Sequence, residues 1–120
     1  MEEFYTKIGG NYNETKNRLI REDLIRRFVC QFPQDPSFGQ LEESLNASDL
    51  KNAFNAIHTL KGVSLNLGFD RLSNRAVLLT DALRENRRDS VTSAQLQELF
   101  NAVKESYLEV LQAIGQLPKA

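Results

Sequence analysis

The chain has 120 residues, enough for one domain with its own core, and its 15 Lys and Arg nearly balance its 16 Asp and Glu. This balance gives no electrostatic reason to expect nucleic acid or a membrane surface as partner. No signal peptide or run of about 18 apolar residues is present, so we expect a soluble, cytoplasmic protein. The single cysteine, Cys30, excludes an internal disulfide, and its apolar neighbours Phe28, Val29 and Phe32 predict a buried thiol.

Helical periodicity recurs along the chain and strand patterns are missing, which predicts an all-α fold. A short helix is expected from Glu3 to Ile8, and Asn13 is a candidate cap for a second one. The segment from Glu22 to Phe32 is predicted to be helical and to end at Pro33. Its apolar stripe consists of Ile25, Phe28, Val29 and Phe32.

The next helix is expected to begin with Asp35 as its cap and Pro36 as its first residue. Its inward positions are Phe38, Leu41 and Leu45. Ser48 or Asp49 can cap the helix that follows. Gly68 is the expected carboxyl-terminal stop of that helix, because a glycine readily adopts the left-handed conformation that ends helices.

Two further helices complete the pattern. One begins at Asp70 and is expected to end near the polar run from Asn86 to Ser90, and the last begins with a capping box formed by Thr92 and Gln95. The inward positions are Leu72, Ala76, Leu79 and Leu83 in the first, and Leu96, Leu99, Val103, Tyr107, Val110 and Ile114 in the second.

Short connections between amphipathic helices imply antiparallel neighbours. The sequence therefore predicts an antiparallel up-down four-helix bundle over about residues 22–117. Additional short helices within about residues 3–32 are expected to flank it, and the whole of residues 1–120 to form a single domain.

The helix that ends at Gly68 contains the only histidine of the chain, His58. On a wheel of about 100° per residue, His58 lies roughly 140° from the centre of the apolar stripe, so we expect it to be exposed. The stripe consists of Leu50, Ala53, Ile57, Leu60, Ser64 and Leu67. The residues near His58 on the outer face are Lys51, Phe54, Asn55, Lys61, Gly62 and Leu65.

These neighbours distinguish His58 from an incidental surface histidine. Gly62 costs on the order of 1 kcal/mol relative to alanine within a helix, which indicates that something approaches the backbone there. Lys61, three residues after His58, can reach an anion carried by the ring. Phe54 and Leu65 add an apolar rim typical of a docking surface, although packing beneath the amino-terminal helices is an equal alternative for Phe54.

The run from His58 to Phe69, His-Thr-Leu-Lys-Gly-Val-Ser-Leu-Asn-Leu-Gly-Phe, resembles the signature of histidine-containing phosphotransfer (HPt) domains of two-component phosphorelays. In that family a His-x-x-Lys-Gly stretch lies on one helix of a four-helix bundle. Val63 departs from the small residue that many members have there. The resemblance implies that His58 accepts a phosphoryl group from an aspartyl-phosphate of a response-regulator receiver domain and relays it to another receiver.

By the same resemblance, Lys61 and Gly62 belong to the reaction site, and Phe54, Asn55, Leu65 and Lys51 to the partner-binding surface. A neutral imidazole nitrogen is nucleophilic near pH 7, because the ordinary pKa of imidazole is about 6.5. The implied partners are receiver domains and a hybrid sensor histidine kinase. The resemblance also implies that this domain is a monomer. Magnesium is expected on the partner receiver, and no metal or cofactor in this domain.

Autonomous kinase activity is not expected, because the chain has no Gly-rich phosphate-binding loop. Thr59 also occupies the position after the histidine where the dimerisation helix of a histidine kinase usually has an acidic residue. The main alternative is a non-catalytic helical adaptor, a degenerate HPt-like domain that binds a signalling partner through Phe54 and Leu65. A metal-dependent bundle enzyme is disfavoured, since one histidine supplies too few ligands.

Overall fold

The computed structural model describes residues 1–19 and 21–118, and these form helices joined by short connections. In chain order the elements are α1 (Glu2–Lys7), α2 (Tyr12–Leu19), α3 (Glu22–Gln31), the 3-10 turn η1 (Phe32–Gln34), α4 (Ser37–Asn46), α5 (Leu50–Leu67), α6 (Asp70–Ala82), the 3-10 turn η2 (Arg88–Ser90) and α7 (Ser93–Gly115). No strand occurs in the described residues, and the predicted all-α fold is confirmed.

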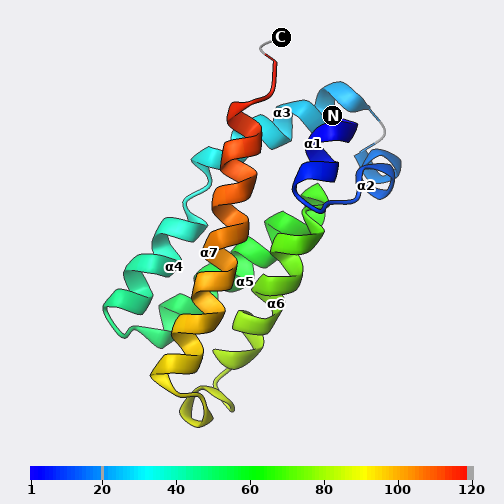
Figure 1. The fold of residues 1–120 in the computed structure, drawn as a ribbon. Coiled ribbons are helices and arrows are strands. Elements are labelled where there is room, and N and C mark those ends of the chain that lie inside the picture. Colours follow the sequence, from blue (N-terminus) through cyan, green and yellow to red (C-terminus); the bar gives the residue numbers. More distant parts are fainter. Residues whose placement is uncertain (20, 119–120) are drawn as a thin grey trace.

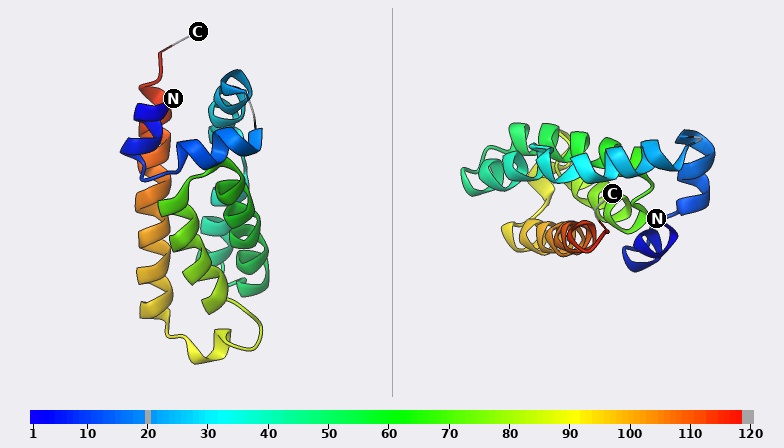
Figure 2. Two further views of the ribbon diagram at one scale, coloured as in Figure 1. Left: turned by 90° about the vertical axis from the view of Figure 1, so that its right-hand side faces the viewer. Right: turned by 90° about the horizontal axis from the view of Figure 1, so that it is seen from above.

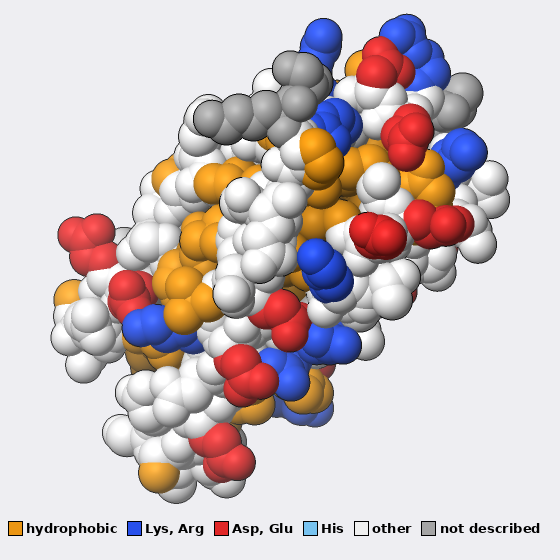
Figure 3. Space-filling model, turned by 45° about the horizontal axis from the view of Figure 1, so that its top comes forward, with side chains coloured by type: hydrophobic (Ala, Val, Ile, Leu, Met, Phe, Trp, Pro, Cys, Tyr) orange, Lys and Arg blue, Asp and Glu red, His pale blue; other side chains and the backbone are white. Residues whose placement is uncertain are grey.

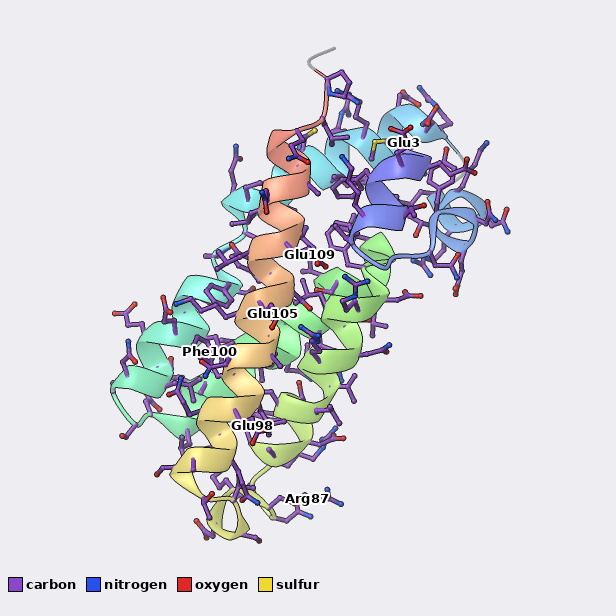
Figure 4. All side chains as sticks on the ribbon, viewed as in Figure 1. Glu3, Arg87, Glu98, Phe100, Glu105 and Glu109 are labelled. Atoms are coloured by element: carbon purple, nitrogen blue, oxygen red, sulfur yellow. The ribbon has the colours of Figure 1, made fainter. Side chains whose placement is uncertain are left out.

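Helices α4, α5, α6 and α7 form an antiparallel up-down bundle in which each helix packs against the next (Figure 1). The molecule is elongated, with extents of 45 × 23 × 19 Å. Helices α1, α2 and α3 gather at the end where α5 passes into α6, and α2 and α3 lie across the bundle axis (Figure 2). The connection from α6 to α7, which carries Arg87, lies at the opposite end (Figure 4).

The core is built from the apolar stripes that the sequence predicts, and aromatic rings join its parts. Phe38 of α4 stacks on Tyr107 of α7 with ring centroids 4.1 Å apart. Phe32 meets Phe69 edge-on at 5.1 Å, and Phe4 of α1 is also buried against this cluster. Hydrophobic side chains are visible on both sides of α7 in Figure 3. The amino-terminal helices therefore share one hydrophobic cluster with the bundle.

Two ion pairs fix α6 against α7. Glu109 and Glu105 lie on α7 (Figure 4), where they pair with Arg71 at 2.5 Å and Arg75 at 3.6 Å. These side chains are partly exposed, so each pair adds little to stability and mainly sets the relative position of the two helices.

Several predicted helix boundaries are confirmed by their hydrogen bonds. Asp49 caps α5 by accepting a hydrogen bond from the amide of Asn52 at 3.2 Å. Gly68 ends the same helix with φ +73°. Thr92 and Gln95 form the reciprocal capping box of α7.

Two predictions about α3 are wrong. Cys30 is exposed rather than buried. It follows Val29, whose side chain is fully buried on the inner stripe, and the next residue of a helix points about 100° away around the helix axis. Phe28 also points partly outward and keeps 38 % of its surface exposed. Only Ile25, Val29 and Phe32 form the buried stripe.

Three predicted helix boundaries also need correction, the starts of α2 and α4 and the end of α6. Helix α2 begins before Asn13, and the side chain of Asn11 accepts the hydrogen bond from the Glu14 amide at 3.0 Å. Pro36 is the cap of α4 rather than its first residue, while the carboxylate of Asp35 accepts from the Ser37 amide at 2.8 Å. Helix α6 ends at Ala82, earlier than the polar run that was expected to mark its end.

In the part of the chain that the structure describes, no helix combines the length and apolar character that a membrane span requires.

Candidate functional site

The outer face of α5 is fixed by the burial of its inner face. Ala53, Ile57, Leu60, Ser64 and Leu67 are buried as predicted, and Leu50 is half-buried. Because this stripe faces the core, the residues on the opposite side of α5 must face solvent. His58 is exposed there, which confirms the exposure predicted from the helical wheel.

The imidazole of His58 lies against an aromatic ring from the preceding turn. Its ring centroid is 5.9 Å from that of Phe54, and the two planes differ by 19°. On α5 these residues are four positions apart, so helix geometry brings them together. Phe54 is half-buried and lies near Arg84 and the α6–α7 connection, at the end of the bundle away from the amino-terminal helices, so the alternative that it packs beneath those helices is wrong. It restricts the orientations open to the His58 ring.

Arg84, just after the end of α6, also reaches Phe54. Its guanidinium carbon is 6.0 Å from the centroid of the Phe54 ring, within the range of a cation–π contact. The Nε atom of Arg84 is 3.1 Å from a carboxylate oxygen of Asp81, which holds the side chain in place. A positive charge from α6 is thus added beside the aromatic neighbour of His58.

Lys61 and Gly62 follow His58 on the outer side of α5. Lys61 is half-buried, and neither it nor Lys51 forms an ion pair with another described residue. A Cβ atom added to Gly62 would meet no atom within 4 Å outside the helix's own backbone. Packing inside the protein therefore gives no reason for a glycine at this position.

Two surface depressions lie on either side of this part of α5. One, of about 490 Å³, is lined by Lys51, Phe54, Asn55, Arg84, Glu85, Asn86 and Arg88. The other, of about 370 Å³, is lined by Gln40, Glu43, Ser44, Asn52, Asn55, Ala56 and Thr59. Asn55 borders both and forms the ridge between them. The depression beside the α6–α7 connection has three cationic side chains, from Lys51, Arg84 and Arg88. The depression beside α4 is lined by polar residues and the carboxylate of Glu43.

The carboxyl end of α5 is held by residues from the start of the chain. The hydroxyl of Tyr5 donates to the carbonyl of Leu67 at 2.6 Å, and the guanidinium of Arg18 donates to the carbonyls of Leu65 and Asn66. Burial raises the pKa of Tyr5 to about 12, since the charged phenolate would be poorly solvated there. The end of α5 is thus tied internally, in contrast to its outer middle turns.

The structure places all the site residues predicted from the sequence on or beside one face of α5. His58, Gly62, Lys51, Asn55 and Leu65 are exposed, and Phe54 and Lys61 are half-buried. Sequence reasoning missed Arg84 and Arg18. Both act across helices that are distant in sequence, so no local spacing could have found them. The described residues contain no cluster of three or more His, Cys, Asp or Glu able to hold a metal ion.

Comparison with protein-family models gives a match over most of the chain. Residues 23–116 match a protein-family model described as the Hpt domain. No curated protein and no solved structure matches the chain. The match spans most of the chain and includes α4, α5, α6 and α7 in full, and α3 from its second residue onward. The chain therefore belongs to the Hpt domain family, whose members transfer phosphoryl groups in two-component signalling and interact with response-regulator receivers.

Proposed function

We propose that this protein accepts a phosphoryl group on His58 from the aspartyl-phosphate of one receiver domain and relays it to a second receiver. The observation that carries the proposal is the arrangement around His58. The ring is exposed and lies against Phe54. It is followed by a lysine that has no ion-pair partner among the described residues and by a glycine with open space above it. In this proposal residues 1–120 act as one domain.

In the proposed step, a neutral imidazole nitrogen attacks the phosphorus atom in line with the bond to the aspartyl oxygen. The nitrogen–phosphorus bond forms, the phosphorus–oxygen bond breaks, and the carboxylate leaves with the electron pair. The other ring nitrogen keeps its proton. In the second step an aspartate of the next receiver attacks phosphorus and releases neutral imidazole. Such transfer depends mainly on positioning and charge stabilisation.

Each neighbour has a role in this proposal. Lys61 stabilises the charge spread over the phosphoryl oxygens, and Gly62 leaves room for the phosphoryl group and the loops of the receiver. Phe54 limits the orientation of His58. Lys51, Asn55, Leu65 and the newly identified Arg84 form the rim on which a receiver docks. Positive charge on this rim complements the acidic phosphorylation pocket that receivers carry.

Magnesium for the transfer is supplied by the receiver, and this domain needs no metal or cofactor and has no kinase activity of its own. A hybrid sensor histidine kinase provides the first phosphoryl group. The protein acts as a cytoplasmic monomer.

Intact-mass measurement with a panel of phosphorylated receivers tests the proposal. The wild-type protein should gain one phosphate that is labile in acid and stable in base, and should lose it when a second receiver is added. His58→Gln should abolish the gain and leave receiver binding largely intact.

A control separates the site from the mere presence of an imidazole. Gln112 is exposed on α7, so the double variant His58→Gln and Gln112→His moves the only histidine to a plain helical surface. That variant should stay unphosphorylated. A protein that binds receivers and keeps its signalling activity after His58→Gln would instead be the helical adaptor.

A further inference from the structure

The first helices of the chain complete the end of the helix that carries His58. The last carbonyls of an α-helix have no partners within the helix and must be satisfied from elsewhere. In α5 the carbonyl of Leu67 accepts from the hydroxyls of Tyr5 and Thr15 at 2.6 and 3.3 Å. The carbonyl of Gly68 accepts from the backbone amide of Asn11 at 2.9 Å. Residues before position 23, where the family match begins, thus close this helix.

Arg18 is the charged member of this set. One nitrogen of its guanidinium donates to the carbonyls of Leu65 and Asn66, at 2.9 and 2.8 Å. The side chain also lies 3.7 Å from Glu14 on its own helix and remains 40 % exposed. A cation at this position is stabilised by the negative end of the α5 dipole. Together with the amide of Gly68, which also donates to the Leu65 carbonyl at 3.1 Å, Arg18 therefore holds the backbone of the last outward-facing turn of α5.

Leu65 belongs to that turn and is one of four large apolar side chains that stay exposed in the described residues, with Phe28, Leu78 and Leu108. It leaves 49 % of its surface exposed on the side of α5 that carries His58. It lies seven residues after the histidine, which places it about 10 Å further along the helix axis. An apolar side chain whose backbone is already fixed loses less freedom when a partner covers it, and this raises affinity.

We propose that Arg18 is a positioning residue that fixes Leu65 for contact with an apolar part of the receiver surface, about 10 Å from the receiver's phosphorylated aspartate. This inference rests on the proposed function, because it takes a receiver domain as the partner. The contact surface is continuous with the proposed docking face around His58. The acidic pocket of the receiver faces the cations near His58, and its apolar part covers Leu65.

The test is a double-mutant cycle on the affinity for a receiver, measured by calorimetry with the full chain. Leu65→Ala should weaken binding about tenfold, and Arg18→Ala about threefold. If Arg18 acts through Leu65, the double variant should bind like Leu65→Ala alone. Equal weakening by Arg18→Ala in both backgrounds, or none in either, would overturn the inference.

Two control variants distinguish the positioning role of Arg18 from general electrostatic attraction and from loss of folding. Lys16→Ala removes a neighbouring charge of α2 that makes no hydrogen bond to α5, and it should bind normally. Equal losses in Lys16→Ala and Arg18→Ala would mean general electrostatic attraction and would overturn the positioning role. If Arg18→Ala does not fold, Arg18→Gln keeps donors for the carbonyls and should retain most of the affinity, whereas a full loss would again contradict the inference.

Transfer to His58 is measured in the same samples by intact mass, which separates the two claims. Binding without transfer would refute the proposed function. The role of Arg18 would then be judged from the affinities in the double-mutant cycle alone. The absence of binding by the wild-type protein to every receiver in the panel would overturn this inference, whatever the mass measurement shows.

Discussion

Gly62 and Gly68 lie six residues apart on α5, and their surroundings differ completely. At Gly68 the backbone is left-handed with φ +73°, and an added Cβ would overlap the hydroxyl of Thr15. At Gly62 an added Cβ would meet no atom within 4 Å outside the helix backbone, although glycine there costs about 1 kcal/mol relative to alanine. The folded chain itself requires Gly68, whereas no packing among the described residues explains Gly62, which the proposed function assigns to the approach of a receiver.

The same contrast holds for the polar groups of the two regions. At the carboxyl end of α5, carbonyls are paired with Tyr5, Thr15 and Arg18. In the outer middle turns, by contrast, Lys61 has no ion-pair partner among the described residues. Substitutions of Gly68 and Tyr5 should therefore change stability, and substitutions of Gly62 and Lys61 should change transfer.

The largest effect is expected at Gly68. Gly68→Ala should lower the free energy of unfolding by about 2–5 kcal/mol, because it combines a left-handed non-glycine residue with a steric overlap. Chemical denaturation followed by circular dichroism measures this. Thr15→Ala removes the overlapping hydroxyl, so the double variant should recover part of the loss. A Gly68→Ala protein of wild-type stability would show that this end of α5 is not tied as described.

Gly62 should behave in the opposite way. Gly62→Gln should slow transfer about 100-fold, since a long side chain displaces the receiver from its reactive position, while stability is unchanged or slightly higher. Quench-flow measurement of phosphate gain gives the rate. Gly62→Ala is the matched control: it should stabilise the helix by about 1 kcal/mol and slow transfer much less. Normal transfer by Gly62→Gln would remove the partner-based explanation of this glycine.

Lys61 should affect the reaction more than the fold. Lys61→Ala should slow transfer about tenfold, because one charge-assisted contact to the phosphoryl oxygens is lost. Single-turnover kinetics with one receiver measures the change, and Lys61→Arg should restore much of the rate. Unchanged kinetics for Lys61→Ala would make this lysine an ordinary surface charge.

Tyr5 gives the smallest expected effect and a pH dependence. Tyr5→Phe should cost about 1 kcal/mol, since one buried hydrogen bond to Leu67 is lost while Thr15 still donates there. Burial raises the pKa of Tyr5 to about 12 from its ordinary value of about 10, so the folded state prefers the neutral phenol.

The raised pKa of Tyr5 determines the pH range over which the protein loses stability. The contribution of Tyr5 is fully present below about pH 10 and is lost as the pH rises toward about 12. Denaturation of the wild-type protein across this range should show a larger loss of stability than denaturation of Tyr5→Phe. The pKa values of Tyr12 and Tyr107 are raised in the same direction, so the variant should keep part of the dependence. Parallel curves for the two proteins would contradict the buried role of Tyr5.

Local rules made much of this molecule predictable from its sequence. The inner stripe of α5, its stop at Gly68 and the capping box at Thr92 depend on neighbours within a few residues, and all three are confirmed. The exposure of Cys30 was missed because apolar neighbours in sequence do not share one side of a helix.

The contacts that shape the site could not be predicted in the same way. Arg84 meets Phe54 across thirty positions of sequence, and Arg18 meets Leu65 across forty-seven. Such contacts depend on how the helices pack. The chemistry suggested by His58, Lys61 and Gly62 was visible in the sequence, because these residues lie within two turns of one helix.

The most direct test of the central claim is to locate the phosphate. The protein is incubated with a phosphorylated receiver, digested under mildly basic conditions that preserve phosphohistidine, and sequenced by tandem mass spectrometry. Phosphate on His58, and its loss on addition of a second receiver, is the expected result. Phosphate on another residue, or none on the folded wild-type protein with a complete receiver panel, would contradict the claim that His58 is the phosphoryl acceptor.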